Sequence, residues 1–373
     1  MNELKEIIKA YDAAKESGNA CVLATVVHVQ GSSYRRPGAR MLVLENGLMI
    51  GAISGGCLEG DALKKALLTF TEKKSRLVSY DTSDEDDATI GIQLGCEGII
   101  QVLFEYIVST DLNNPIELLR KAIAKRQLAI IVTLYDLSDK RNNQMGTCFL
   151  LDNQGEVNSL ISSALLNQLI HHDANQVLLS NLSVFKTYSL ENIVTNAFIE
   201  YLRPPISLVV VGAGNDAVPL MQMATILGWE VNVVDGRSTH AKKERFISAC
   251  QVIVSRPELV VDQILIDSRT CFVLMTHNYK YDLQMLKALI DKDVSYIGIL
   301  GPKKKMQKML NDIESEKIEL SEQQLSKIYG PTGLDIGAET AEEIAISIIA
   351  EIQAVFNQKQ GTMLKWKKDQ IHS

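Results

Sequence analysis

Two cysteines of the amino-terminal half directly follow glycine, in Gly55-Gly56-Cys57 and in Gly95-Cys96. Cys57 stands at the predicted start of a helix, where the helix dipole would stabilise a thiolate for nucleophilic or metal-binding chemistry. Gly55 and Gly56 would let a bulky ligand approach the backbone. The alternative for each thiol is a buried structural cysteine, which is the commoner fate of a free cysteine.

Residues 31–36 form a second polar segment, in which serine hydroxyls precede Tyr34, Arg35 and Arg36. Hydroxyls and adjacent guanidinium groups are suited to binding an oxyanion or a phosphate, because each guanidinium offers a planar set of N–H donors. The glycine, arginine and cysteine loops of this half together favour a binding site over isolated structural thiols.

The carboxyl-terminal half carries the pattern Gly212-x-Gly214-x-x-Ala217 between a short apolar strand and a helix. In a dinucleotide-binding fold the first glycine permits a tight turn, the second lets the backbone approach a pyrophosphate, and the small third residue packs the helix on the strand. The helix start would then face the phosphates. Asp235, at the end of the next strand, would bind a ribose diol and favour NAD or FAD over NADP. Arg237 could instead neutralise a 2′-phosphate, and a Rossmann fold without a nucleotide is the alternative.

Polar residues recur where the other predicted strands of this half end. His277 follows the fourth strand and Gly301 follows the fifth. Because ligands bind at the carboxyl ends of the strands in open α/β sheets, these residues belong to the same candidate site. An imidazole makes His277 a candidate acid, base or ligand, the alternative being a packing or capping role. The remaining strand-end residues are Arg256, Asn278 and Lys303-Lys304-Lys305.

Apolar periodicity predicts the elements that position the first group of loops. The expected order is helix, strand, hairpin, helix and two further strands, with the Cys57 loop entering the second helix. An acidic loop is expected over 81–95, and short alternating helices and strands over 115–200. The predicted elements are 3–16, 20–29, 41–44 with 48–53, 58–70, 77–80 and 99–107.

Arg203-Pro204-Pro205 predicts a linker, because two adjacent prolines remove two backbone donors and stiffen the chain. Beyond it, β-rich runs alternate with helices, which predicts a Rossmann-type, doubly wound parallel sheet. The fold class is therefore α/β, with an α+β domain over 1–203, whose motifs lie in 1–110, and a nucleotide-binding domain over 204–373. We expect no internal repeat. The predicted strands of the second domain are 207–211, 230–234, 251–254, 271–276 and 295–299.

Composition argues against several classes of function. A net charge of −7, without a basic face, argues against general binding to nucleic acid or acidic membranes. The longest apolar runs are too short to cross a bilayer, and the first residues lack the layout of a signal peptide. None of the six cysteines forms a C-x-x-C pair, so we predict no metal site and reduced thiols in the cytoplasm.

These loops resemble motifs of the XdhC/CoxI family, the accessory proteins of xanthine dehydrogenase and related molybdenum hydroxylases. The resemblance spans nearly the whole chain and is weakest between about 110 and 200. Tyr34, Glu97 and Asn215 depart from the family pattern, and Asn215 stands where an imidazole is frequent. The matching segments are Ala24-Thr25-Val26-Val27, Gly31-Ser32, Arg35-Arg36-Pro37-Gly38-Ala39-Arg40-Met41, Gly51, Ser54-Gly55-Gly56-Cys57-Leu58-Glu59, Leu94-Gly95-Cys96, Gly212-Ala213-Gly214, Val234-Asp235, Arg237, Thr276-His277, Asp282, Tyr296-Ile297-Gly298-Ile299-Leu300-Gly301 and Gly333-Leu334-Asp335-Ile336-Gly337-Ala338-Glu339-Thr340.

The resemblance implies a chaperone that binds the molybdenum cofactor while its terminal sulfido ligand is installed, and then passes it to an apo-hydroxylase of the xanthine dehydrogenase type. A cysteine desulfurase would be the second partner. Arg35 and Arg36 would face the phosphate of molybdopterin, and Cys57 and Cys96 would lie beside its soft dithiolene and metal. A homodimer is the assembly that base rates favour.

An NAD-dependent oxidoreductase is the alternative function, with His277 as acid or base beside the nicotinamide. FAD, or no nucleotide at all, would also fit the second domain. Xanthine dehydrogenase itself is excluded, since the chain lacks the cysteine sets of 2Fe–2S clusters and 373 residues cannot hold molybdenum, flavin and cluster domains together.

Overall fold

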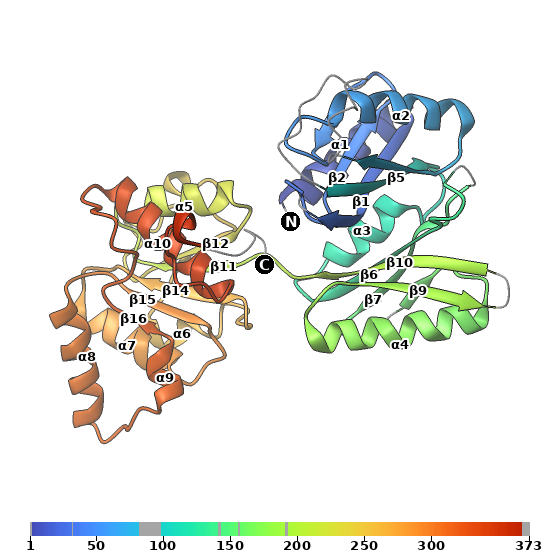
Figure 1. Cartoon of the computed structure of the whole chain (residues 1–373). Coiled ribbons are helices and arrows are strands. Elements are labelled where there is room, and N and C mark those ends of the chain that lie inside the picture. The colour runs from blue at the N-terminus through green and yellow to red at the C-terminus, as the bar shows by residue number, and fades with distance from the viewer. Residues whose placement is uncertain are drawn as a thin grey trace. The chain divides into compact units, whose positions relative to one another are not determined.

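The chain divides into two compact units, Met1–Pro204 and Pro205–Ser373 (Figure 1). The division falls between two adjacent prolines, where the backbone lacks the N–H groups that would continue a strand ladder. The fold is that of a computed structural model, which describes residues 2–31, 33–81, 98–140, 143–155, 157–190 and 193–367.

The first unit is built on two five-stranded antiparallel sheets. Their described strands follow the orders β3-β2-β1-β5-β4 and β8-β7-β6-β10-β9. The elements of its first half are α1 (Asn2–Glu16), β1 (Cys21–Gly31), β2 (Arg40–Leu44), β3 (Met49–Gly51), α2 (Glu59–Glu72), β4 (Arg76–Asp81) and β5 (Gly98–Ile107). Those of its second half are α3 (Pro115–Ile123), β6 (Ala129–Tyr135), β7 (Gly146–Asp152), β8 (Val157–Ser159), α4 (Ala164–Ser180), β9 (Val184–Leu190) and β10 (Ile193–Leu202).

The elements predicted for the first half are present, with ends that differ by a few residues. α1 buries the face predicted from its periodicity, including Leu4, Ile7 and Tyr11. The predicted acidic loop lies, beyond Asp81, outside the described residues.

The two halves of the first unit share one topology. Each runs helix, three strands, helix and two strands, and each places its five strands in the same relative order. Our expectation of no internal repeat is therefore wrong for the fold. The repeat is hidden in the sequence because a core accepts many combinations of apolar residues, so equal topology does not require equal side chains.

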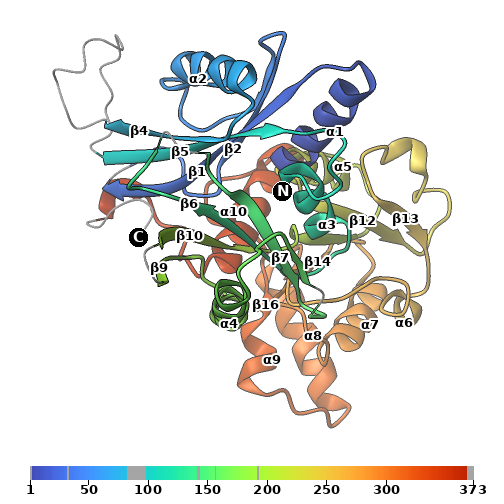
Figure 2. The ribbon, with the colours of Figure 1, turned by 90° about the vertical axis from the view of Figure 1, so that its right-hand side faces the viewer.

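Helices pack on both of these sheets. α2 packs on one face of the first sheet, as the side view of Figure 2 shows, and α4 packs on β6, β9 and β10. A separate apolar cluster combines α1 and α3 with strands of both sheets, which therefore share a core. Fully buried members of this cluster are Ile7, Leu23, Leu119 and Ile131.

The second unit is a parallel sheet whose strands follow the order β13-β12-β11-β14-β15-β16. This confirms the predicted doubly wound, Rossmann-type sheet, in which the winding reverses between β11 and β14. The strands are β11 (Ser207–Val211), β12 (Glu230–Asp235), β13 (Gln251–Val254), β14 (Thr270–Leu274), β15 (Tyr296–Ile299) and β16 (Ile328–Tyr329). The helices are α5 (Ala217–Ile226), η1 (Lys243–Arg245), α6 (Pro257–Val260), α7 (Tyr279–Leu289), α8 (Lys303–Ser315), α9 (Glu322–Ser326), α10 (Ala341–Phe356) and η2 (Leu364–Trp366).

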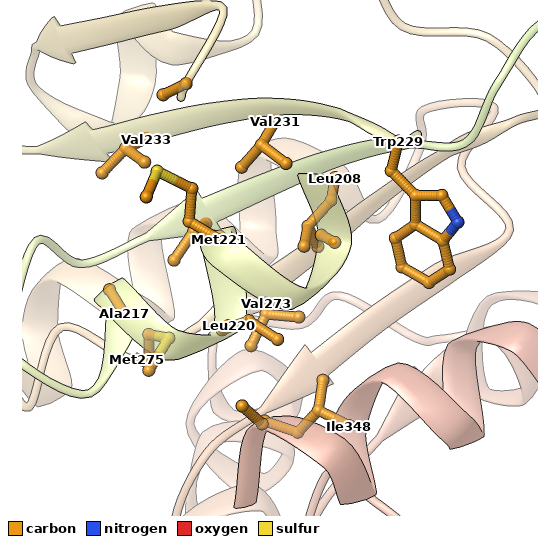
Figure 3. Close-up of a cluster of buried hydrophobic side chains, with 14 of the residues drawn as sticks. Leu208, Ala217, Leu220, Met221, Trp229, Val231, Val233, Val273, Met275 and Ile348 are labelled. Atoms are coloured by element: carbon orange, nitrogen blue, oxygen red, sulfur yellow. The ribbon is translucent and has the colours of Figure 1, made fainter. Parts of the chain in front are cut away.

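Helices cover both faces of this parallel sheet. α5 and α10 pack on one face, around Leu208, Val231 and Val273 (Figure 3). α6, α7 and α8 pack on the other face, around Val209 and Phe272. Apolar residues on both faces of each strand are typical of parallel sheets. Within the described residues, no helix is long and apolar enough to cross a membrane.

Candidate functional site

Cys57 lies in the loop between β3 and α2, and Ser54 and Glu59 order that loop. The Ser54 hydroxyl accepts the N–H groups of Gly56 and Leu58, at 3.1 and 3.0 Å, and donates to Glu59 Oε2 at 2.5 Å. The Ser54 N–H donates to Glu59 Oε1 at 2.9 Å. Burial works to raise the pKa of Glu59, but hydrogen bonds from Ser54 and from nearby backbone groups together outweigh it and lower that pKa. The bonds satisfy N–H groups near the helix start, as a capping residue does, and order the backbone around the thiol.

The Cys57 side chain is half-buried and packs beside the apolar cluster that includes α2. Its neighbour Gly56 has φ +110°, and among the described residues a Cβ placed there would meet no atom within 4 Å. Gly56 therefore borders open space next to the thiol. The space beside Gly55 is taken by the chain itself, because the ring of Tyr34 would lie 3.3 Å from a Cβ there. Of the two glycines, only Gly56 leaves room beside Cys57.

Cys57 is more exposed than three other thiols of the chain, which are buried. Burial raises the pKa of Cys21 to about 11, and a thiol in such surroundings is inert. Cys96, the second predicted thiol, lies outside the described residues. In the described part of the chain, no three His, Cys, Asp or Glu side chains are grouped to hold a metal ion. The buried thiols are Cys21, Cys148 and Cys271.

Glu3 of α1 binds the first of the two arginines that we predicted to bind phosphate. Its carboxylate oxygens accept Arg35 Nη2 at 2.7 and 2.5 Å, and one of them accepts the N–H of Ala52 at 3.0 Å. Glu3 thus ties the arginine segment to the chain that leads into the Cys57 loop. Arg35 is neutralised within the chain, whereas Arg36 is exposed. The sequence showed no signal for Glu3, because the contact joins residues 32 positions apart.

The dinucleotide loop of the second unit follows β11 and enters α5. Gly212 has φ +126°, and a Cβ there would lie 2.5 Å from the carbonyl oxygen of Met275, so only glycine fits. Ala217 opens α5 and is fully buried in the cluster of Figure 3. The small side chain lets the helix pack closely on the sheet, as the sequence pattern requires.

Asp235, predicted to bind a ribose, is engaged within the chain. Its carboxylate accepts the N–H of Ala213 at 2.8 Å, and the N–H, Nε and Nη2 of Arg237 at 2.9, 2.9 and 2.7 Å. Burial works to raise the pKa of Asp235, but the hydrogen bonds from Arg237 and Ala213 outweigh it and lower that pKa. A ribose diol would have to displace Arg237 to reach this carboxylate.

Arg245 binds the same loop through the backbone carbonyl oxygens. Its guanidinium donates to the backbone oxygens of Ala213 and Gly214, at 2.7 and 3.3 Å, and to Asn215 Oδ1 at 2.9 Å. The loop is thus held by Asp235 through an N–H group and by Arg245 through carbonyl groups. Sequence reasoning missed Arg245, which comes from a 3-10 turn about 30 residues further along the chain.

His277 follows β14 and pairs with the dinucleotide loop. Its Nε2 lies 2.9 Å from Asp216 Oδ2, and its side chain is 71% exposed. The residue has φ +56°, a left-handed conformation that is uncommon for a residue with a Cβ. Asn278 beside it, and not His277, caps α7, because its side chain accepts the N–H of Tyr281.

The predicted run of three lysines divides, and its last member is bound within the chain. Lys305 Nζ donates to Asp282 Oδ2 at 2.7 Å and to the carbonyl oxygen of Leu300 at 2.9 Å, while Lys303 and Lys304 are exposed. Asp282 is fully buried and also accepts the Thr276 hydroxyl at 2.6 Å. A charged, hydrogen-bonded network therefore supports the ends of β14 and β15. A Cβ at Gly301 would contact the Lys305 stem at 3.1 Å.

The predicted residues thus form two groups, one in each unit. The carboxyl edge of the parallel sheet brings together Gly212, Gly214, Asp235, Arg237, His277 and Gly301. The first unit holds the Cys57 loop and the arginine segment, joined through Glu3.

Two family models match the chain. The model of the XdhC and CoxI family matches residues 14–81, and the model of the XdhC Rossmann domain matches residues 208–352. The first range contains the arginine segment and the Cys57 loop, and the second contains the carboxyl edge of the parallel sheet.

Curated and solved relatives extend over both units. A protein of Bacillus subtilis (strain 168), named as a probable xanthine dehydrogenase subunit, is 32% identical over 348 residues, 91% of this chain and 94% of the relative. The molybdenum cofactor insertion chaperone PaoD of Escherichia coli (strain K12) is 22% identical over 96% of this chain and 91% of its own length. A crystal structure named as a xanthine dehydrogenase from Bacillus halodurans has a TM-score of 0.74 at 28% identity, covering 96% of this chain and 98% of that chain.

Proposed function

Because the chain belongs to the XdhC and CoxI family, we propose that it is a maturation factor of a molybdenum hydroxylase and that its cargo is the molybdenum cofactor. A relative that matches 96% of the chain is named a molybdenum cofactor insertion chaperone. The protein holds the cofactor while a cysteine desulfurase supplies its sulfido ligand, and then delivers it to an apo-hydroxylase of the xanthine dehydrogenase type. It acts in the cytoplasm as a homodimer.

The Cys57 loop is the feature that carries this proposal. Its thiol is half-buried on a backbone ordered by Ser54 and Glu59, and Gly56 borders open space beside it. A thiolate is a soft group, suited to lie next to the dithiolene and metal of the cofactor. Glu3 ties the Arg35–Arg36 segment to the chain that leads into this loop, and we assign the cofactor's phosphate to this segment, in which Arg35 is paired with Glu3 and Arg36 is exposed.

We assign the chain no hydroxylase or NAD-linked oxidation. The six cysteines lack the spacing that iron–sulfur clusters of a xanthine dehydrogenase require. The carboxylate expected to bind the ribose of NAD, Asp235, is bound to Arg237 and to the dinucleotide loop. We therefore interpret the similarity to relatives named for xanthine dehydrogenase as support for a role of this chain in the maturation of that enzyme.

Retention of the cofactor by a Cys57→Ala variant tests the proposal. The full chain is purified from cells that synthesise the molybdenum cofactor and from cells that do not, and the bound pterin is measured by fluorescence after oxidation. We expect the wild type to retain pterin only from the first cells, and the variant to lose most of it, because the soft neighbour of the cofactor is removed.

Cys250→Ala is the matched control, since it removes an exposed thiol from the other unit. It should retain as much pterin as the wild type, and both variants should keep the wild-type unfolding midpoint. Undiminished retention by Cys57→Ala would remove Cys57 from the site. A wild type that retains no pterin above the cofactor-free preparation would refute the proposed function.

A further inference from the structure

The winding of the parallel sheet reverses between β11 and β14. In open α/β sheets the loops that follow two such strands border a crevice, and the word crevice here means the position between these two loops. In open α/β sheets, nucleotides bind at this point of reversal, with their phosphates at the start of the first helix. Here the first loop is 212–216 and the second begins at Met275. The side chains that meet across this point decide what can enter.

Asp216 occupies the phosphate side of the crevice. It is the N-cap residue of α5, yet its carboxylate makes no capping bond to that helix. Instead the carboxylate folds back over Gly214, so that a Cβ on Gly214 would be under 3.0 Å from Asp216 Oδ1. Its second oxygen, Oδ2, lies 2.9 Å from His277 Nε2, on the opposite loop. The Asp216–His277 pair therefore spans the crevice.

In a dinucleotide-binding fold, the space next to the second glycine of the pattern, here Gly214, is where the pyrophosphate binds. The glycine is there so that a phosphate can approach the backbone, and in this chain a carboxylate approaches it instead. A diphosphate would meet the Asp216 carboxylate at a site that otherwise attracts anions, and like charges at this range repel.

We propose that Asp216 is a specificity-determining residue of the second unit: its carboxylate, held by His277, takes the place of a phosphate and excludes dinucleotides that are joined through a diphosphate. This inference goes beyond the proposed function and does not depend on it, because it concerns only the crevice of the parallel sheet. It explains how a chain can keep the glycines of a dinucleotide loop without using NAD.

Binding of ADP-ribose, NAD⁺ and adenosine to the full chain, measured by calorimetry, tests this. Asp216→Asn keeps the size of the side chain and removes its charge, and Asp216→Ala removes both. We expect either variant to bind ADP-ribose and NAD⁺ about tenfold more tightly than the wild type, because a charge facing the diphosphate is lost. Adenosine has no phosphate, so its affinity should not change.

Asp293→Asn is the control, since this exposed aspartate precedes β15 at the opposite edge of the sheet and carries the same charge. It should bind all three compounds as the wild type does. The proposal is overturned if the wild type binds NAD⁺ as tightly as the Asp216 variants do, or if neither variant gains affinity for a diphosphate. An equal gain for adenosine would also overturn it, because that result would mean a general opening of the crevice.

Discussion

Glu105 of β5 and Glu200 of β10 occupy equivalent places in the two halves of the first unit, pairing in register with Leu23 and Ile131 respectively. Each carboxylate reaches into the opposite half, where it meets a glycine. A Cβ at Gly146 would lie under 3.0 Å from Glu105, and a Cβ at Gly38 would lie equally close to Glu200. The two residues thus form a reciprocal contact between the halves.

The two glutamates differ in what compensates their charge. Glu200 receives the guanidinium of Arg40 at 2.5 Å, whereas Glu105 accepts the N–H and hydroxyl of Thr147, at 2.6 and 3.0 Å. Burial therefore raises the pKa of Glu105 to about 7, with Thr147 and Arg40 offsetting it only in part. One half of the reciprocal contact is an ion pair and the other is a titratable acid.

Glu105→Gln should stabilise the first unit at neutral pH relative to the wild type. Between pH 4.5 and about 7 the unfolded chain releases a proton that the folded chain keeps, so the wild type loses stability as pH rises through this window. The loss approaches about 3 kcal/mol above pH 7, and glutamine, which mimics the neutral acid, avoids it. Denaturant unfolding at pH 5, 6, 7 and 8 measures the difference.

The exposed Glu45→Gln is the control for this series, and its difference from the wild type should not vary with pH. A constant difference between Glu105→Gln and the wild type would show that Glu105 is ionised over the whole range.

At the scale of elements, α2 and α4 hold equivalent places in the two halves but begin differently. α4 starts with Ser163, whose hydroxyl accepts the N–H of Leu166. The start of α2 is displaced by the Cys57 loop, and Ser54 spans that loop to reach Leu58. The longer connection before α2, which contains Cys57, distinguishes the first half as the one that carries the candidate site.

Ser54→Ala should loosen the Cys57 loop. Losing a buried hydroxyl that accepts hydrogen bonds costs about 1 kcal/mol of stability. The half-buried thiol should become more accessible because two loop N–H groups lose their acceptor. We expect alkylation of Cys57, followed by mass spectrometry, to accelerate several-fold. Ser163→Ala should cost similar stability and leave that rate unchanged, and equal rates in both variants would mean that Ser54 does not protect the thiol.

At the scale of the whole molecule, each unit has its own core. The described apolar clusters fall either within residues 4–202 or within residues 206–356. A unit with a separate core can open by itself, so destabilisation of one unit is expected to stay within it.

Leu208→Ala and Leu23→Ala test this separation, since both leucines are fully buried, one in each unit. Each substitution should cost about 2–5 kcal/mol. Hydrogen exchange of the full chain, followed by mass spectrometry, should show loss of amide protection in the second unit for Leu208→Ala and in the first for Leu23→Ala. Loss across both units in either variant would mean that the chain unfolds as one body.

The sequence by itself determined the elements of the first half, the parallel sheet and the places of Gly212 and Ala217. These features depend on residues a few positions apart, since apolar periodicity and the pattern of a strand–loop–helix are local. The sequence did not show the internal repeat, because the two halves have the same topology but different residues at equivalent positions.

Only the tertiary structure decided what the predicted side chains contact. Arg35 is taken by Glu3, Asp235 by Arg237 and His277 by Asp216, and two of these three contacts join residues 32 and 61 positions apart. A charged side chain in a loop can reach several partners, and the packing of distant elements selects among them. The sequence therefore identified the chemical groups of both loops, while the fold decided which of those groups are already paired within the chain.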